Sequence, residues 1–184
     1  MKIVSTFTVI EDSLYAVKYE QEKYNEFNKL FTLWNNAEYL DNFFSEHKED
    51  LNRPYWGGIN PSDAILKTRK DAKLLEKKIL QVAQRGKTDK DETLSTLFKP
   101  LHKDPLNLDP YEKNKAYGLV TQSWLRIYAI RINVNLFVVS GGSIKLTPNM
   151  NEREHLLLEL KKLEITQKYC KDELDLDLRY FEMG

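Results

Sequence analysis

The residues best suited to chemistry lie in one short segment, residues 123–132, which mixes aromatic, basic and aliphatic side chains. Successive side chains of a β-strand point to opposite faces of the sheet, so Trp124, Arg126 and Tyr128 are predicted to share one face. A surface that is both aromatic and basic can bind single-stranded RNA, because bases stack on the rings and phosphates contact the cation. The same pattern is also typical of an arginine packed between aromatic rings for stability, or of a dimer interface.

The charge around this segment differs from that of the whole chain. Lys plus Arg and Asp plus Glu both total 28, so no overall field draws the protein towards nucleic acid. Residues 111–147 nevertheless hold five bases against one acid, whereas residues 25–52 hold six acids against two bases. We therefore expect a positive surface over the C-terminal strands only. Its charged residues are Lys113, Lys115, Arg126, Arg131, Lys145 and Glu112.

Other catalytic patterns are not found in the sequence. Cys170 is the one cysteine, and no Cys/His spacing matches a zinc site, so neither a metal nor a cofactor is expected. Of the three histidines, His47 falls on an apolar stripe, while His102 and His155 are candidates for a general acid or base. A hydrolase of small molecules is disfavoured, since no nucleophile or pair of carboxylates stands out.

Hydrophobic periodicity predicts the elements that position these residues in an α+β fold. Alternation over residues 2–10 and 14–19 predicts an N-terminal β-hairpin. Three- and four-residue steps predict two long amphipathic helices, over residues 25–51 and 62–85, with a break in the first near residues 35–36. The two helices should form an αα-hairpin.

The C-terminal part is predicted to be a three-stranded antiparallel meander followed by a helix. The strand candidates are residues 115–120, 123–132 and 136–146, separated by short polar breaks, and the helix covers residues 151–171. Gly141 and Gly142 lack the spacing of a phosphate-binding loop. A glycine pair inside a strand indicates a bulge or the close approach of another backbone.

The chain of 184 residues is predicted to be a single domain, residues 1–184. Residues 87–110 are predicted to be an irregular connection, and residues 172–184 a flexible or partner-binding tail. The N-terminus does not resemble a signal peptide, and no apolar run is as long as a membrane span. Together with the unpaired Cys170, these features predict a bacterial-type cytoplasmic protein that does not bind membranes.

Three segments of the predicted meander resemble the RelE/ParE superfamily of bacterial toxins, and in particular its HigB-like branch. Residues 116–119 resemble the first strand of that family, residues 125–128 the second, and residues 137–147 the third. The resemblance covers about residues 97–165. The chain departs from the family pattern at three points: Gly141-Gly142 replace a His, Leu146 replaces a Lys, and Val120 replaces an Arg.

The resemblance implies an activity and roles for single residues. RelE-type toxins cleave ribosome-bound mRNA without a metal, and basic side chains hold the phosphate during attack by the 2′-hydroxyl. By analogy, Arg126 holds phosphate, Lys145 stabilises the developing charge, and Tyr128 or Tyr117 stacks on a base or transfers a proton. The catalytic candidates are thus Arg126, Lys145 and Tyr128, and the RNA-binding candidates are Lys115, Tyr117, Trp124 and Thr147.

The expected partners follow from the same resemblance. They are mRNA or the ribosome, together with an antitoxin protein. A different class of function also fits the residues: a non-catalytic interaction protein, such as a homodimer, in which Trp124, Tyr128 and the segment 174–180 form a protein interface. The two hypotheses make opposite demands, because the first requires an open basic face and the second a covered one.

Overall fold

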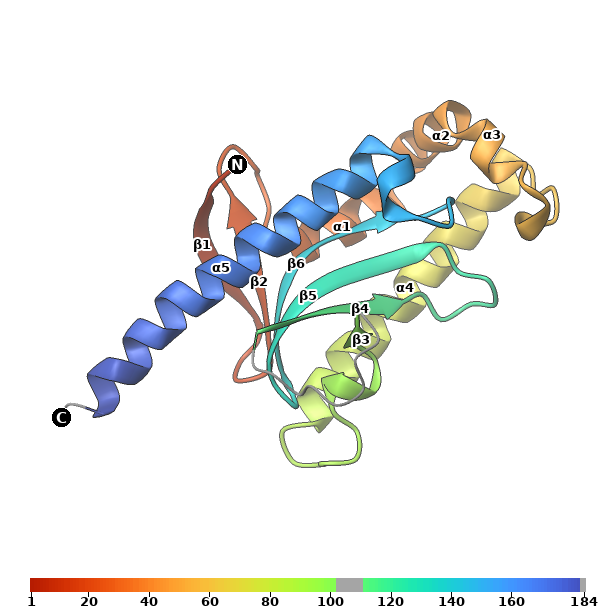
Figure 1. Cartoon of the computed structure of the whole chain (residues 1–184). Coiled ribbons are helices and arrows are strands. Elements are labelled where there is room, and N and C mark those ends of the chain that lie inside the picture. The colour runs from red at the N-terminus through yellow and green to blue at the C-terminus, as the bar shows by residue number, and fades with distance from the viewer. Residues whose placement is uncertain (102–110, 183–184) are drawn as a thin grey trace.

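The computed structural model describes residues 1–101 and 111–182, and side chains as far as residue 173. It is an α+β fold built on one six-stranded sheet, in the order β1-β2-β6-β5-β4-β3 (Figure 1). All neighbouring strands are antiparallel except β2 and β6, which are parallel. This parallel pair joins the predicted hairpin to the predicted meander. The strands are β1 (Ile3–Ile10), β2 (Leu14–Tyr19), β3 (Lys99–Pro100), β4 (Glu112–Tyr117), β5 (Leu125–Asn133) and β6 (Leu136–Ile144).

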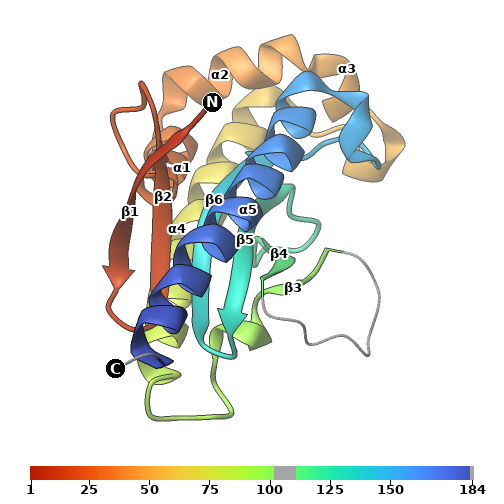
Figure 2. The ribbon, with the colours of Figure 1, turned by 60° about the vertical axis from the view of Figure 1, so that its left-hand side comes forward.

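Helices cover both faces of the sheet. Helix α5 crosses one face, and α4 lies behind the other together with α1 and α2 (Figures 1 and 2). Each face buries its own apolar cluster: Ile127 and Ala129 belong to the cluster under α1, α2 and α4, whereas Tyr128 and Ile130 belong to the cluster under α5. The strand alternation predicted for β5 is therefore confirmed over these positions. The helices are α1 (Glu26–Asn35), α2 (Ala37–Glu46), α3 (Lys48–Leu51), α4 (Pro61–Arg85) and α5 (Glu154–Glu182).

The predicted break in the first long helix is confirmed. Asn36 separates α1 from α2, and its side chain accepts a hydrogen bond from the backbone N–H of Tyr39. An asparagine at an N-cap satisfies one of the donors that a helix start leaves free. The break lets Leu30 of α1 and Leu40 of α2 both enter the core, although the two helices have different axes.

Helix α5 is longer than predicted. It includes residues 172–182, which were expected to be a tail, while residues 183–184 lie outside the described part. Among the described residues, no helix is long and apolar enough to cross a membrane.

The glycine pair in β6 has the predicted role. The pairing of β5 with β6 shifts register between Tyr128 and Ala129, which places a bulge beside Gly141. A Cβ atom added at Gly142 would lie 2.6 Å from the carbonyl oxygen of Arg126 and 2.7 Å from Leu30 Cδ1. Neighbouring backbone and α1 therefore leave no room for a side chain at Gly142.

Replacing Gly142 by alanine should lower the free energy of unfolding by about 1–3 kcal/mol, because overpacking forces backbone shifts. Urea denaturation followed by circular dichroism measures the loss. Thr8→Ala, on the exposed side of β1, is the control and should change stability little. Equal stability of Gly142→Ala and the wild type would contradict the tight packing of β6 against α1.

Candidate nucleic-acid interface

Three segments that are far apart in the sequence meet at one cleft of about 240 Å³: residues 53–56, Arg126 and residues 145–148. The 3-10 turn Pro54–Trp56 and Arg53 form one wall, and Arg126 of β5 and Lys145 after β6 form the other. Lys115 and Tyr117 of β4 border Arg126 and Lys145. We call this site the basic cleft, defined by Arg53, Tyr55, Lys115, Tyr117, Arg126 and Lys145.

Arg126 is held in place on two sides and remains open on a third. Its Nη1 atom donates hydrogen bonds to the carbonyl oxygens of Ser123, at 2.8 Å, and Leu125, at 2.7 Å. Its guanidinium lies 4.2 Å from the centre of the Tyr117 ring. Burial lowers the pKa of Arg126 from its ordinary value. An arginine has five N–H donors, so donors on Nε and Nη2 remain for an anionic ligand.

Lys145 approaches the same space from the end of β6. Its Nζ atom donates hydrogen bonds to the backbone oxygens of Thr147, at 2.6 Å, and Pro148. Burial lowers the pKa of Lys145, and the positive charges of Arg126 and Lys115 lower it further. The three cations are thus close enough to repel one another.

No carboxylate of the described chain lies within ion-pair distance of this group, although Glu152 acts on Lys145 and Asp71 acts on Arg126 from farther away. Within the described part of the chain, none of Arg126, Lys145 and Lys115 forms an ion pair, although Arg53 at the rim pairs with Asp50 and Glu152. Three neighbouring cations without an acidic partner destabilise the fold, and a bound anion offsets that repulsion. The arrangement is therefore suited to binding phosphate groups.

Two aromatic rings of the basic cleft face solvent. Tyr55 is 64% exposed, which makes its ring available for stacking on a base, whereas Tyr117 is 43% exposed and carries the Arg126 guanidinium over its ring. The next residue in the chain, Trp56, is held firmly in place. Its Nε1 donates a hydrogen bond to the carbonyl oxygen of Leu146, and its ring packs edge-on against Trp124, so the backbone at Tyr55 has a fixed neighbour.

No protein-family model, curated protein or solved structure matches this chain. Its function is therefore inferred from the geometry of its own residues.

The structure brings together four of the predicted site residues, Arg126, Lys145, Lys115 and Tyr117. A fifth, Thr147, lines the same cleft but is buried, and its hydroxyl donates to the carbonyl oxygen of Asn149. Thr147 therefore supports Lys145 through its backbone oxygen and does not present its side chain to a ligand.

The predicted exposed role of Trp124 is wrong. The side chain is 1% exposed and packs against Phe44 and Trp56 in the main core, while its Nε1 donates to Thr68 Oγ1 of α4. Strand β5 begins only at Leu125, so the alternation that placed Trp124 beside Arg126 does not extend to it. Trp124 therefore cannot stack on RNA or form a protein interface without local unfolding.

The predicted exposed role of Tyr128 is also wrong, for a different reason. Tyr128 does share the face of Arg126, but α5 covers it, and its hydroxyl contacts Met150 Sδ at 3.0 Å. Burial raises the pKa of Tyr128 well above its ordinary value. A buried, neutral phenol cannot exchange a proton with a ligand in the basic cleft.

The two histidines of the described chain, His47 and His155, do not line the basic cleft. His47 is stacked on Phe43, as expected for a residue at the edge of the core, and His155 hydrogen-bonds with the carbonyl oxygen of Ile144. Burial lowers the pKa of His155, so its neutral form is favoured. His102 lies outside the described residues. Among those that are described, no group of His, Cys, Asp and Glu could hold a metal ion.

Sequence reasoning missed Arg53 and Tyr55. The stretch from Asn52 to Pro61 was interpreted only as a turn that ends a helix, because prolines and glycines dominate it. One signal could have identified this wall of the basic cleft: the turn contains an arginine, a tyrosine and a tryptophan within four residues.

The loop between β4 and β5 is positioned by Asp71 of α4. One oxygen of this buried carboxylate accepts hydrogen bonds from the backbone N–H groups of Leu119, at 2.6 Å, and Val120, at 3.1 Å. The other oxygen accepts a hydrogen bond from the hydroxyl of Ser123. Because the Ser123 carbonyl holds Arg126, Asp71 anchors the basic cleft indirectly.

Proposed function

We propose that this protein binds single-stranded RNA in the basic cleft and cleaves it through attack by the 2′-hydroxyl. The observation that carries the proposal is the group of three cations, Arg126, Lys145 and Lys115, without an acidic partner in the described chain. A protein with no net charge has little reason to concentrate cations beside two exposed tyrosines unless an anion with flat rings binds there.

Single-stranded RNA fits this cleft better than a duplex. Tyr55 offers a ring face that an unpaired base can reach, whereas a stacked base pair cannot reach it. The cleft is also small, about 240 Å³, which suits one nucleotide and its phosphate and not a helix.

The residues of the cleft support one reaction. Arg126 binds the phosphate, the 2′-oxygen forms a bond to phosphorus, and the bond to the 5′-oxygen breaks to leave a 2′,3′-cyclic phosphate. Lys145 stabilises the additional negative charge of the transition state. Tyr117 is the proposed group for proton exchange, because its side chain is partly exposed and its ring contacts Arg126, whereas Tyr128 is buried.

The resemblance to RelE/ParE toxins supports a more specific version of the proposal. In that version the substrate is mRNA on the ribosome, the protein acts in the bacterial cytoplasm, and an antitoxin protein covers the basic cleft when the toxin is inactive. In this version such a partner also contacts the C-terminal part of α5, residues 172–182.

The experiment uses a labelled single-stranded RNA, a DNA of the same sequence and an RNA methylated at every 2′-oxygen. Binding is measured by fluorescence anisotropy, and cleavage by gel electrophoresis with and without translating ribosomes. We expect all three to bind and only the unmodified RNA to be cut, leaving cyclic phosphate ends. Binding without cleavage in both conditions would remove the enzymatic part of the proposal, and absence of binding would remove all of it.

The affinity for RNA should fall with rising pH earlier than an ordinary lysine would allow. Lys145 binds phosphate only as the cation, and its pKa is lowered, so as the pH rises it loses its charge before an ordinary lysine, whose pKa is about 10.4, would do so. Lys145→Arg keeps the charge at all of these pH values and should flatten the profile. The measurement is RNA anisotropy against pH for both proteins, and parallel profiles would contradict the role of Lys145.

A further inference from the structure

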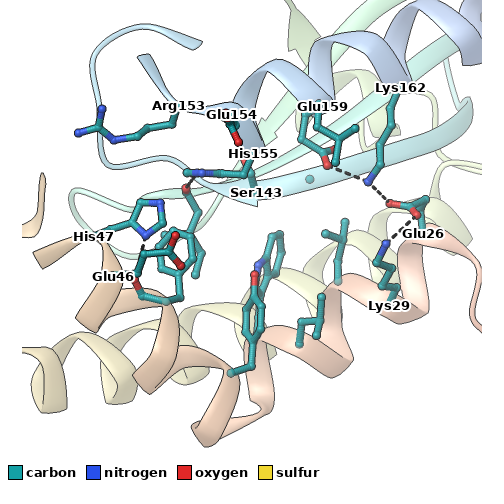
Figure 3. Close-up of a pocket in the computed structure, with 18 residues that line it drawn as sticks. Glu26, Lys29, Glu46, His47, Ser143, Arg153, Glu154, His155, Glu159 and Lys162 are labelled. Carbon is teal, nitrogen blue, oxygen red and sulfur yellow. Dashed lines mark hydrogen bonds and ion pairs between the residues drawn. The ribbon is translucent and has the colours of Figure 1, made fainter. Parts of the chain in front are cut away.

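A second and larger pocket, of about 510 Å³, lies on the other side of β6 from the basic cleft, between α1, α2 and the start of α5 (Figure 3). It opens where two strands separate. Strand β2 pairs with β6 only from Leu14–Phe137 to Ala16–Val139, so β6 has a free edge beyond that point. At this free edge of β6 the carbonyl oxygen of Ile144 hydrogen-bonds with His155. Alternate residues of a strand direct their backbone groups to the same edge, so the backbone groups of Gly142 also point to the free edge.

One end of the pocket is polar and buried. Glu159 and Lys162 reach into it from α5, and Glu26 and Lys29 reach towards them from α1 (Figure 3). Lys162 Nζ lies 2.9 Å from Glu26 Oε2 and 2.8 Å from Glu159 Oε1. This bridge holds the two helices together across the gap between the strands.

The second carboxylate oxygen of Glu159 is not used by the fold. The residue is 5% exposed, yet Oε2 has no hydrogen-bond partner in the described structure. It lies so close to the backbone of β6 that a Cβ atom at Gly141 would be 2.0 Å away. An unpaired buried acceptor costs about 1–3 kcal/mol. A ligand that donates a hydrogen bond to Oε2 would offset this cost.

The charges of the pocket favour a cationic ligand. Its three bases are already paired, Lys162 with Glu26 and Glu159, Lys29 with Glu22 and Glu26, and Arg153 with Asp50. Two further acids of its wall, Glu46 and Glu154, are exposed and form no ion pair within the described residues. A positive group entering the pocket therefore meets carboxylates that no base has neutralised.

The rest of the wall is largely apolar and combines aromatic with aliphatic side chains. Trp34, Tyr39 and Phe43 line the pocket between its polar end and His47. Aromatic faces attract cations and pack well against flat or aliphatic groups. The volume lies within the range of about 300–1,000 Å³ that small-molecule sites occupy.

We infer that this pocket binds a small organic cation, in which an ammonium or guanidinium group on an apolar body donates to Glu159 Oε2 and the body packs against Trp34, Tyr39 and Phe43. The inference is independent of the proposed RNA function, because none of these residues belongs to the basic cleft.

The test compares three probes of the same shape and different charge: tryptamine, the neutral alcohol tryptophol, and the anion indole-3-propionate. Isothermal titration calorimetry measures each affinity for the full chain, and agmatine serves as an aliphatic guanidinium probe. We expect tryptamine to bind about tenfold more tightly than tryptophol, since a charge-assisted hydrogen bond is worth more than a neutral one. No binding by either cation at millimolar concentration, or equal binding of the three indoles, would overturn the inference.

Variants then locate the site. Glu159→Gln keeps the shape but removes the charge, and should reduce tryptamine binding to the level of tryptophol. Glu154→Gln, at an exposed position of the wall, should weaken binding severalfold and decides the matter if Glu159→Gln does not fold. Glu164→Gln is the matched control, because Glu164 is exposed on the same helix outside the pocket. If Glu164→Gln weakened tryptamine binding equally, the affinity would depend only on general surface charge, which would contradict specific binding in the pocket.

Discussion

Replacing Arg126 by alanine should lower the affinity for single-stranded RNA by about 10- to 100-fold, because charge-assisted hydrogen bonds to phosphate contribute about 1.5–3 kcal/mol. Cleavage should be lost with the phosphate contact. Arg126→Lys should recover only part of the affinity, since lysine cannot reproduce the fixed fork of donors that Ser123 and Tyr117 hold in place. Fluorescence anisotropy with a labelled RNA measures the change.

Salt dependence separates the loss of a phosphate contact from damage to the fold. If Arg126 contacts one phosphate, its removal should reduce the slope of log affinity against log salt concentration by about 0.7. Arg85→Ala is the matched control, because Arg85 is an exposed arginine at the end of α4 that pairs with Glu92. Equal weakening by Arg85→Ala and Arg126→Ala would mean that RNA binds through general charge and not in the basic cleft.

Replacing Asp71 by alanine should reduce the free energy of unfolding by about 3 kcal/mol, since it leaves two backbone N–H groups and a hydroxyl without their buried acceptor. Asp71→Asn should cost less, because the Ser123 hydroxyl can turn and accept from the amide. Urea denaturation measures both changes. RNA binding should weaken in Asp71→Ala even under conditions where the protein stays folded, because the loop that holds Arg126 loses its anchor.

The control for Asp71 is Asp41→Ala, which removes an exposed carboxylate from α2 and should change stability by less than about 0.5 kcal/mol. A loss of stability in Asp71→Ala no larger than that of the control would contradict the anchoring role. Unchanged RNA affinity in a folded Asp71→Ala protein would show that Arg126 keeps its position without the loop.

Local patterns in the sequence were sufficient to predict most of the elements. Alternation identified β1, β2, β5 and β6, and the three- and four-residue steps identified the helices, including the break at Asn36. These predictions succeeded because an element of the core must show its apolar residues at the period of its own backbone. The same local reasoning ended α5 about ten residues too early, because Leu174, Leu176, Leu178 and Tyr180 alternate as they would in a strand, and the segment was assigned to a tail.

The candidate site was predicted only in part. Arg126, Lys145, Lys115 and Tyr117 could be proposed from the local excess of positive charge together with the resemblance to the RelE/ParE superfamily, and they lie together. Alternation can assign two residues to one face of a strand, but it does not say which part of that face another element covers. For that reason Tyr128 was placed correctly on its face and wrongly at the surface.

The sequence by itself determined the fold class, the order of the elements and the local excess of positive charge, because these depend on composition and on short-range periodicity. Tertiary structure alone decided that Arg53 and Tyr55 stand opposite Arg126, that α5 covers Tyr128, and that β2 separates from β6 above a pocket containing Glu159. The physical reason is that these contacts join residues far apart in the chain. Their positions follow from how helices pack on both faces of the sheet and not from any local pattern.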